Sequence, residues 1–233
     1  MTAPSYREFA LAQTTAGPAG LAPEITLQLA TQAQRIFQAA EEFERPAVDR
    51  FPPYWAFAWP GGQAMARYIL DNPSLVSGIR VADIGAGSGI AGIAAAMVGA
   101  IHVLAADIDP VAEAAIRINA AVNGCVAQIV TTTRDQLGHL PDADLIIISD
   151  LVYEPELAIR VDNFLDMAVA AGMPVLIGDR LTARRPVASL EELGHYRAHL
   201  VPELSDGYVE EARVWRLLPR RSGRQNAKKA STA

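Results

Sequence analysis

The chain has 233 residues, of which 51% are hydrophobic and 20% are charged, and its formal net charge is -6. This composition excludes a disordered chain and a coiled coil, and the length suits one large α/β domain. The single cysteine, Cys125, excludes an intramolecular disulfide and a cysteine-cluster zinc site, and it fits the reducing cytoplasm. The negative charge argues against nucleic acid as a partner.

The first part of the chain is predicted to cap the rest. Residues 1–20 are small and polar, and we expect them to be disordered. After Pro23, apolar residues recur at helical spacing, which predicts a helix that ends before Pro46. Residues 51–62 then concentrate aromatic and turn residues, which suggests a loop that covers a pocket. The predicted cap spans residues 21–75.

Residues 76–219 form the predicted core, in which strands and helices alternate. Strands are expected at residues 80–84, 102–106, 127–131, 145–149, 174–177, 196–201 and 213–218. Helices are expected at residues 63–70, 90–98, 111–123, 156–171 and 187–193. Several strands are apolar throughout, as in a parallel sheet covered on both faces, and the last two are joined too closely for a helical crossover. The sequence therefore predicts one α/β domain over residues 21–219, with a doubly wound, mostly parallel, seven-stranded sheet and an antiparallel last strand.

Other segments carry no functional signal. Residues 220–233 are basic and poor in apolar residues, and we expect a disordered tail. Residues 84–106 hold no charged residue, but glycines and alanines interrupt the run, so a buried strand–loop–helix unit explains it better than a membrane span. We therefore expect no membrane partner. The four histidines show no metal-ligand spacing, so we expect no metal site.

A glycine-rich loop, Asp83-Ile84-Gly85-Ala86-Gly87-Ser88-Gly89, follows the first core strand. Glycines there let a ligand lie directly against the backbone. Counted from Gly87, the glycines satisfy the dinucleotide pattern G-x-G-x-x-G, with Asp107 at the distance that pattern requires. Counted from the strand end at Gly85, the pattern is G-x-G-x-G, and the preceding Asp83 suits the cationic amino group of S-adenosylmethionine. We favour the methyl donor and keep the dinucleotide as the alternative.

Three motifs together resemble class I, Rossmann-like methyltransferases: the glycine loop, Ala106-Asp107-Ile108-Asp109-Pro110, and Asp150-Leu151-Val152-Tyr153-Glu154. The last motif resembles the D-x-x-Y box of the seven-β-strand protein lysine methyltransferases. The segment from Pro23 to Leu29 and the aromatic segment from Pro53 to Ala64 are similar to the lysine methyltransferases of the electron transfer flavoprotein β-subunit.

This resemblance implies S-adenosyl-L-methionine as the cofactor, with S-adenosyl-L-homocysteine as the product and no metal. The residues implied to bind the cofactor are Trp59, Asp83, Gly85, Ala86, Gly87, Gly89, Asp107, Ile108, Thr132 and Ser149. Within this set, Asp107 is expected to hold the ribose and Thr132 is the best candidate for the adenine contact. The implied catalytic residues are Asp150 and Tyr153.

The chemistry of Asp150 can be argued separately. A lysine amine attacks only when it is neutral, and its ordinary pKa is about 10.4. A carboxylate raises that pKa, so Asp150 is predicted to accept an N–H bond and to orient the nitrogen lone pair. Tyr153, Trp55 and Phe57 are predicted to supply apolar and cation–π surroundings. The motif D-L-V-Y differs from N-P-P-Y, which disfavours a nucleobase or an amide as the methyl acceptor.

The sequence thus predicts a cytoplasmic, S-adenosylmethionine-dependent protein-lysine N-methyltransferase. The resemblance implies the β-subunit of the electron transfer flavoprotein as the protein substrate. A ribosomal protein is the nearest alternative substrate, and an NAD(P)-dependent oxidoreductase is the rival class of enzyme.

Overall fold

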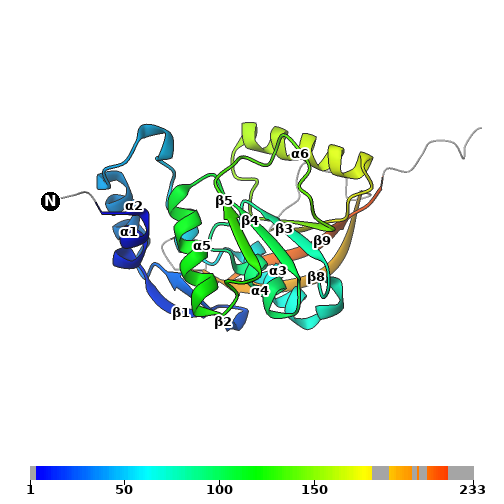
Figure 1. Cartoon of the computed structure of the whole chain (residues 1–233), viewed down its shortest axis with the longest axis horizontal. Coiled ribbons are helices and arrows are strands. Elements are labelled where there is room, and N and C mark those ends of the chain that lie inside the picture. Colours follow the sequence, from blue (N-terminus) through cyan, green and yellow to red (C-terminus); the bar gives the residue numbers. More distant parts are fainter. Residues whose placement is uncertain (1–3, 180–188, 201–203, 205–208, 220–233) are drawn as a thin grey trace, which may run out of the picture.

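A computed structural model describes residues 4–179, 189–200, 204 and 209–219. The amino-terminal elements are α1 (Tyr6–Gln13), β1 (Thr15–Ala19), β2 (Ala22–Leu29) and α2 (Ala33–Glu42). Short 3-10 turns at Ala47–Asp49 and Tyr54–Ala56 lead into α3 (Pro60–Asp71), and another at Pro73–Leu75 follows it. Figure 1 shows the amino-terminal elements gathered at one end of the molecule, beside α5 (Pro110–Val122).

Seven strands make the central sheet, in the order β5-β4-β3-β6-β7-β9-β8. The bounds of these strands are β3 (Arg80–Ile84), β4 (His102–Ala106), β5 (Ile129–Thr132), β6 (Leu145–Ser149), β7 (Val175–Asp179), β8 (Leu190–His199) and β9 (Val209–Leu217). Neighbouring strands run parallel, except that β9 is antiparallel to both β7 and β8. The predicted mostly parallel, doubly wound sheet with an antiparallel last strand is confirmed.

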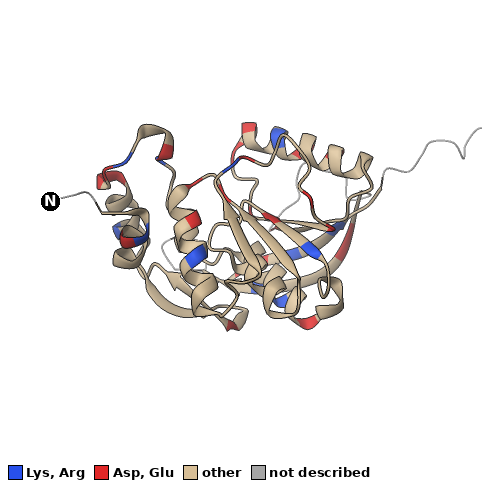
Figure 2. Ribbon diagram, viewed as in Figure 1, with Lys and Arg blue, Asp and Glu red and all other residues tan. Residues whose placement is uncertain are grey.

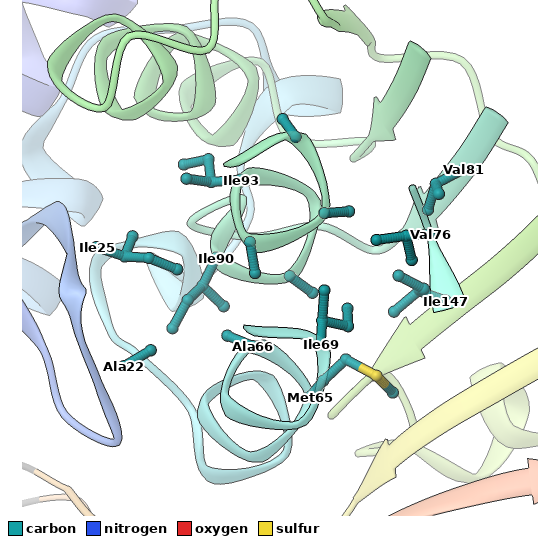
Figure 3. Close-up of a cluster of buried hydrophobic side chains, with 14 of the residues drawn as sticks. Ala22, Ile25, Met65, Ala66, Ile69, Val76, Val81, Ile90, Ile93 and Ile147 are labelled. Carbon is teal, nitrogen blue, oxygen red and sulfur yellow. The ribbon is translucent and has the colours of Figure 1, made fainter. Parts of the chain in front are cut away.

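Both faces of the sheet are buried. On one face, α3 and α4 (Ile90–Met97) pack over the strands, and a cluster that includes Ile69, Ile93 and Ile147 fills the space between them (Figure 3). On the other face, α6 (Pro155–Ala170) contributes Phe164 to a second cluster with Ile146 and Ile148. Successive side chains of β6 therefore enter different cores, which explains why that strand is apolar at nearly every position. None of the described helices has an apolar stretch long enough to cross a bilayer.

The start of the chain differs from the expected disorder. Ser5 caps α1 in a capping box with Glu8, and β1 pairs antiparallel with β2. The helix predicted after Pro23 was wrong for residues 22–29, which form β2, and the helix begins only at Ala33. The side chains of β2 that suggested helical spacing are buried because one face of the hairpin packs on the core.

The carboxyl-terminal elements also differ in part. The helix predicted at residues 187–193 was wrong from Leu190 onward, because those residues begin β8. The strands predicted at residues 196–201 and 213–218 lie within or overlap β8 and β9. The predicted tail at residues 220–233 lies outside the described residues.

A buried glutamine in α3 joins three parts of the chain. The side chain of Gln63 is only 1% exposed. Its Oε1 accepts a hydrogen bond from the backbone N–H of Leu21 at 3.1 Å, and its Nε2 donates to the carbonyl oxygens of Ala58 and His199. The hairpin β1–β2, the aromatic segment before α3 and the end of β8 therefore meet at one amide group.

Candidate active site

A cleft of about 610 Å³ opens at the carboxyl ends of the parallel strands. Open α/β sheets bind ligands at this edge, where the strand order reverses. The loops after β3, β4, β5 and β6 line one side of the cleft, and the aromatic segment before α3 lines the other. Among the described residues, no group of three or more His, Cys, Asp or Glu side chains is placed to hold a metal ion.

The glycine loop connects β3 to α4 along the floor of the cleft. Gly85 has φ +70°, and a Cβ built on it would lie 2.5 Å from a methyl carbon of Leu151, so only glycine fits there. The backbone N–H groups of Gly85 and Ala86 donate to the carbonyl oxygen of Ala106, which fastens the loop to the end of β4. The loop is thus held against the strand ends, and Gly85 and Gly87 line the cleft.

Asp83 lies under this loop and is 2% exposed. Its Oδ2 accepts a hydrogen bond from the backbone N–H of Gly92 at 2.9 Å. Burial, opposed by the Gly92 bond and supported by the nearby charge of Asp107, raises the pKa of Asp83 to about 7. A cationic ligand group in the cleft would favour the ionised form of this carboxylate.

Asp107 follows β4 and faces the same cleft. Its Oδ2 accepts from the backbone N–H of Gly87 at 2.8 Å, and its Oδ1 accepts from the N–H of Asp109 at 3.0 Å. Burial raises the pKa of Asp107. Asp109 itself caps α5 by accepting from the N–H of Val111. Two backbone donors therefore orient the carboxylate of Asp107, whose remaining lone pairs can accept bonds from hydroxyl groups.

Asp150 directly follows β6, which pairs with β3 on the side opposite to β4. Its Oδ2 accepts a hydrogen bond from the backbone N–H of Gly62, in the first turn of α3, at 2.8 Å. Its own backbone N–H donates to the carbonyl oxygen of Gly178 in β7 at 2.9 Å. The neighbouring Ser149 lines the cleft, and its buried Oγ has no hydrogen-bond partner among the described residues.

An aromatic wall stands beside Asp150. The rings of Tyr54 and Tyr153 meet edge to face with centroids 5.1 Å apart, and Tyr54 also meets Trp59 at 5.7 Å. Partial burial, and then the charge of Asp107, raises the pKa of Tyr153 to about 12, so its phenol keeps its proton at neutral pH. Trp55 and Phe57, which the sequence singled out, line the cleft but are each only 2% exposed.

Most of the residues expected to bind the cofactor or the acceptor come together in the cleft. They are Trp59, Asp83, Gly85, Ala86, Gly87, Asp107, Ile108, Ser149, Asp150 and Tyr153. Gly89 does not line it; this glycine has φ +80° as the N-cap of α4 and packs against Ile116. Thr132 does not line it either, and its carbonyl oxygen accepts from the backbone N–H of Asp107 at 3.1 Å.

Sequence reasoning missed the lining residues that follow β5. Arg134, Asp135, Gln136 and Leu137 all face the cleft. Asp135 accepts a hydrogen bond from the backbone N–H of Leu137 at 2.9 Å and is paired with Arg160. The available signal was an acidic residue soon after a strand, the same signal that identified Asp107.

Comparisons with known proteins show what this chain is similar to. Residues 64–166 match the model of the ribosomal protein L11 methyltransferase (PrmA) family. The chain is 40% identical over 207 residues to the electron transfer flavoprotein beta subunit lysine methyltransferase of Xenopus laevis, covering 88% of this chain and 81% of that protein. For the protein of the same name from Danio rerio, the identity is 38% over 205 residues, covering 84% of this chain and 76% of that protein.

A solved structure supports the fold alone. Magnesium protoporphyrin IX methyltransferase from Synechocystis PCC 6803, with bound SAM, is similar with a TM-score of 0.50 and 15% identity, over 68% of this chain and 80% of that chain. The extent and identity of the vertebrate matches decide the family. This chain belongs to the electron transfer flavoprotein beta subunit lysine methyltransferase family.

Proposed function

We propose that this protein is an S-adenosylmethionine-dependent protein-lysine N-methyltransferase whose substrate is the β-subunit of the electron transfer flavoprotein. The observation that carries the proposal is the shared cleft, in which the glycine loop and Asp107 line the same cavity as Asp150. One half of that cavity suits a nucleoside-bearing cation, and the other half suits an amine. The names of the relatives supply the protein substrate.

The residues of the first half fit S-adenosylmethionine. Asp83 is a buried carboxylate whose raised pKa a cationic group would lower, and Asp107 has lone pairs available for the ribose hydroxyls. Asp135 and Gln136 are the proposed contacts to the adenine end, in place of Thr132. Ser149, which lines the cleft beside them, is a further proposed contact to this ligand. When bound, this cofactor supplies an electrophilic methyl group on a positively charged sulfur.

The residues of the second half fit a lysine amine. Lowering the amine pKa from about 10.4 to about 7 costs roughly 4–5 kcal/mol, and desolvation in the cleft favours the neutral amine. Asp150 cannot lower that pKa, since a carboxylate stabilises an ammonium group. Asp150 instead accepts an N–H bond from the amine and holds the lone pair in line for attack. Tyr153 and Tyr54 flank the aliphatic stem of the lysine.

A ribosomal protein remains the second candidate substrate. It is favoured by the match of residues 64–166 to the ribosomal protein L11 methyltransferase family. That match covers the glycine loop and the D-x-x-Y box but ends before β7 and begins inside α3. The family match therefore concerns the segments that are proposed to carry out methyl transfer. The matches to the flavoprotein methyltransferases cover a larger share of the chain, 84% and 88%.

Family membership favours a methyl donor over a dinucleotide, so an NAD(P)-dependent oxidoreductase is no longer a candidate. Figure 2 shows acidic and basic residues interspersed over the described elements, and the net charge of the chain is -6. Both features are consistent with a protein partner rather than nucleic acid. The cytoplasm is the compartment we propose.

The decisive experiment supplies the purified protein with labelled S-adenosylmethionine and, separately, with the electron transfer flavoprotein β-subunit and with ribosomal protein L11. We expect label on a lysine of the flavoprotein subunit, located by mass spectrometry of the digested protein. Label only on L11 would favour the second candidate. Calorimetry with NAD in place of S-adenosylmethionine serves as the control, and we expect no binding of NAD.

A further inference from the structure

Helix α3 begins without a cap from its own sequence. Trp59 occupies the N-cap position and provides no side-chain acceptor, and Pro60 follows with no backbone N–H. The carboxylate that accepts from the first turn comes instead from Asp150, 88 residues later, through the bond from the N–H of Gly62. Helix N-termini favour negative charge, so the start of α3 is a suitable place for this carboxylate, and the Gly62 bond fixes its orientation.

The approach of α3 to the sheet depends on two glycines that touch backbone to backbone. A Cβ built on Gly61 would lie 2.3 Å from the carbonyl oxygen of Gly178 and 2.8 Å from Oδ1 of Asp150. A Cβ built on Gly178 would lie 2.4 Å from the carbonyl oxygen of Gly61 and 3.1 Å from Oγ of Ser149. Neither position accepts a side chain unless the helix and the strand move apart.

The backbone of Asp150 is also unusual. Its φ of +49° makes it the sole residue other than glycine with positive φ in the described part of the chain. Its N–H donates to the same carbonyl group of Gly178 that Gly61 approaches. Asp tolerates the left-handed region better than most residues, but such a conformation persists only where its surroundings hold it.

We propose that Gly61 and Gly178 are positioning residues for methyl transfer. Their contact sets the start of α3 against β7 at the distance at which the N–H of Gly62 holds Oδ2 of Asp150. A carboxylate has about four lone-pair sites, so this bond leaves acceptor capacity for the lysine amine. The inference rests on the proposed function, because the two glycines are proposed to position Asp150 for its bond to the lysine amine.

The test is Gly61→Ala. Gly178→Ala is a second variant, which places a methyl group in the same contact from the side of the sheet. We expect each to lower kcat for methylation of the flavoprotein β-subunit by about tenfold or more, because small misplacements of reacting groups cost rate steeply. For Gly61→Ala, the Kd for S-adenosylmethionine, measured by calorimetry, should stay within about threefold of the original, since Gly61 is not among the proposed cofactor contacts. Gly17→Ala is the matched control, because a Cβ on Gly17 has nothing within 4 Å.

A double-variant cycle asks whether the glycines act through Asp150. In the Asp150→Asn background, Gly61→Ala should change the residual kcat less than about twofold. An unchanged kcat in both glycine variants would overturn the inference, as would a cofactor Kd for Gly61→Ala that rises, or a melting temperature that falls, in step with the loss of kcat. If the unmodified protein transfers no methyl group to any protein substrate, the proposed function itself fails. The two failures can be distinguished, because the inference about the glycines concerns only the variants.

Discussion

The side chain of Asn119, in α5, accepts a hydrogen bond from the backbone N–H of Gln28, in β2, at 2.8 Å. The amide of Asn119 also donates to the carbonyl oxygen of Ser88 in the glycine loop at 2.8 Å, and its side chain is fully buried. One asparagine thus joins the amino-terminal hairpin to the loop that forms the floor of the cleft.

Asn119→Ala should lower the free energy of unfolding by about 2–4 kcal/mol, because it leaves two buried backbone groups without partners. Urea denaturation of the ligand-free protein measures this loss. Asn163→Ala, on the exposed side of α6, is the control and should stay within about 0.5 kcal/mol. A loss as small as that of the control would mean that water replaces the asparagine.

Asp150→Ala should reduce kcat for lysine methylation by about 100-fold or more, because the amine loses the acceptor that orients it. The Kd for S-adenosylmethionine should change less than about threefold, as measured by calorimetry. Asp142→Ala is a suitable control, since Asp142 precedes β6 and lies at the opposite end of that strand. Full activity of the Asp150 variant would remove this residue from the mechanism.

Tyr54→Ala should raise KM for the protein substrate by about 3- to 10-fold, because the ring of Tyr153 loses an aromatic contact of about 0.5–1.5 kcal/mol. Tyr54→Phe keeps the ring and should retain the original KM within about twofold. Steady-state kinetics with the flavoprotein β-subunit separates the two variants. Equal KM values for both would place Tyr54 outside the path of the lysine.

The stability of the ligand-free protein should depend on the ionisation of Asp83. The folded-state pKa of about 7 lies above the ordinary value of 3.8, so the folded state binds this proton more tightly than the unfolded state. The resulting stabilisation is present at low pH and is lost as pH rises through about 7. Asp83→Asn should therefore be more stable than the original protein at about pH 8 by up to a few kcal/mol, and this advantage should shrink toward about pH 5.

Urea denaturation at the two pH values tests this prediction. Asp162→Asn, in a helix remote from the glycine loop, controls for the change of side chain. An advantage of Asp83→Asn that stays constant with pH would show that Asp83 is ionised throughout that range.

The core of the fold could be predicted from the sequence because its strands are buried on both faces. The run from Leu145 to Ser149 has no helical or alternating pattern, and its side chains enter the two clusters on either side of the sheet. The hairpin could not be predicted in this way. In β2, the backbone N–H of Thr26 bonds to the side chain of Asn123, 97 residues later, and no local pattern encodes such a partner.

The same distinction applies to the site. Asp83, Asp107 and Asp150 stand within or just after strong apolar strands, so their common location at one edge of the sheet followed from the strand boundaries. Asp135 was missed because β5, only four residues long and half exposed at the sheet edge, gives a weak apolar signal. The strand was therefore predicted at residues 127–131, too early in the chain. Thr132, which ends β5, was then taken for the first residue of the loop that follows the strand.

The hydrogen bonds of the Gln63 amide determine which segments can be deleted from the protein without disturbing the rest. The bonds to Leu21, Ala58 and His199 join the hairpin, the aromatic segment before α3 and the end of β8 through one side chain. Removal of the hairpin would take away the Leu21 N–H donor and leave Oε1 of Gln63 without that partner, in a side chain whose Nε2 also supports β8. The amino-terminal hairpin is therefore part of the framework of the cleft, and a shortened protein that begins at α3 would lose the hydrogen bonds of the hairpin to Gln63 and to Asn119 and Asn123 of α5.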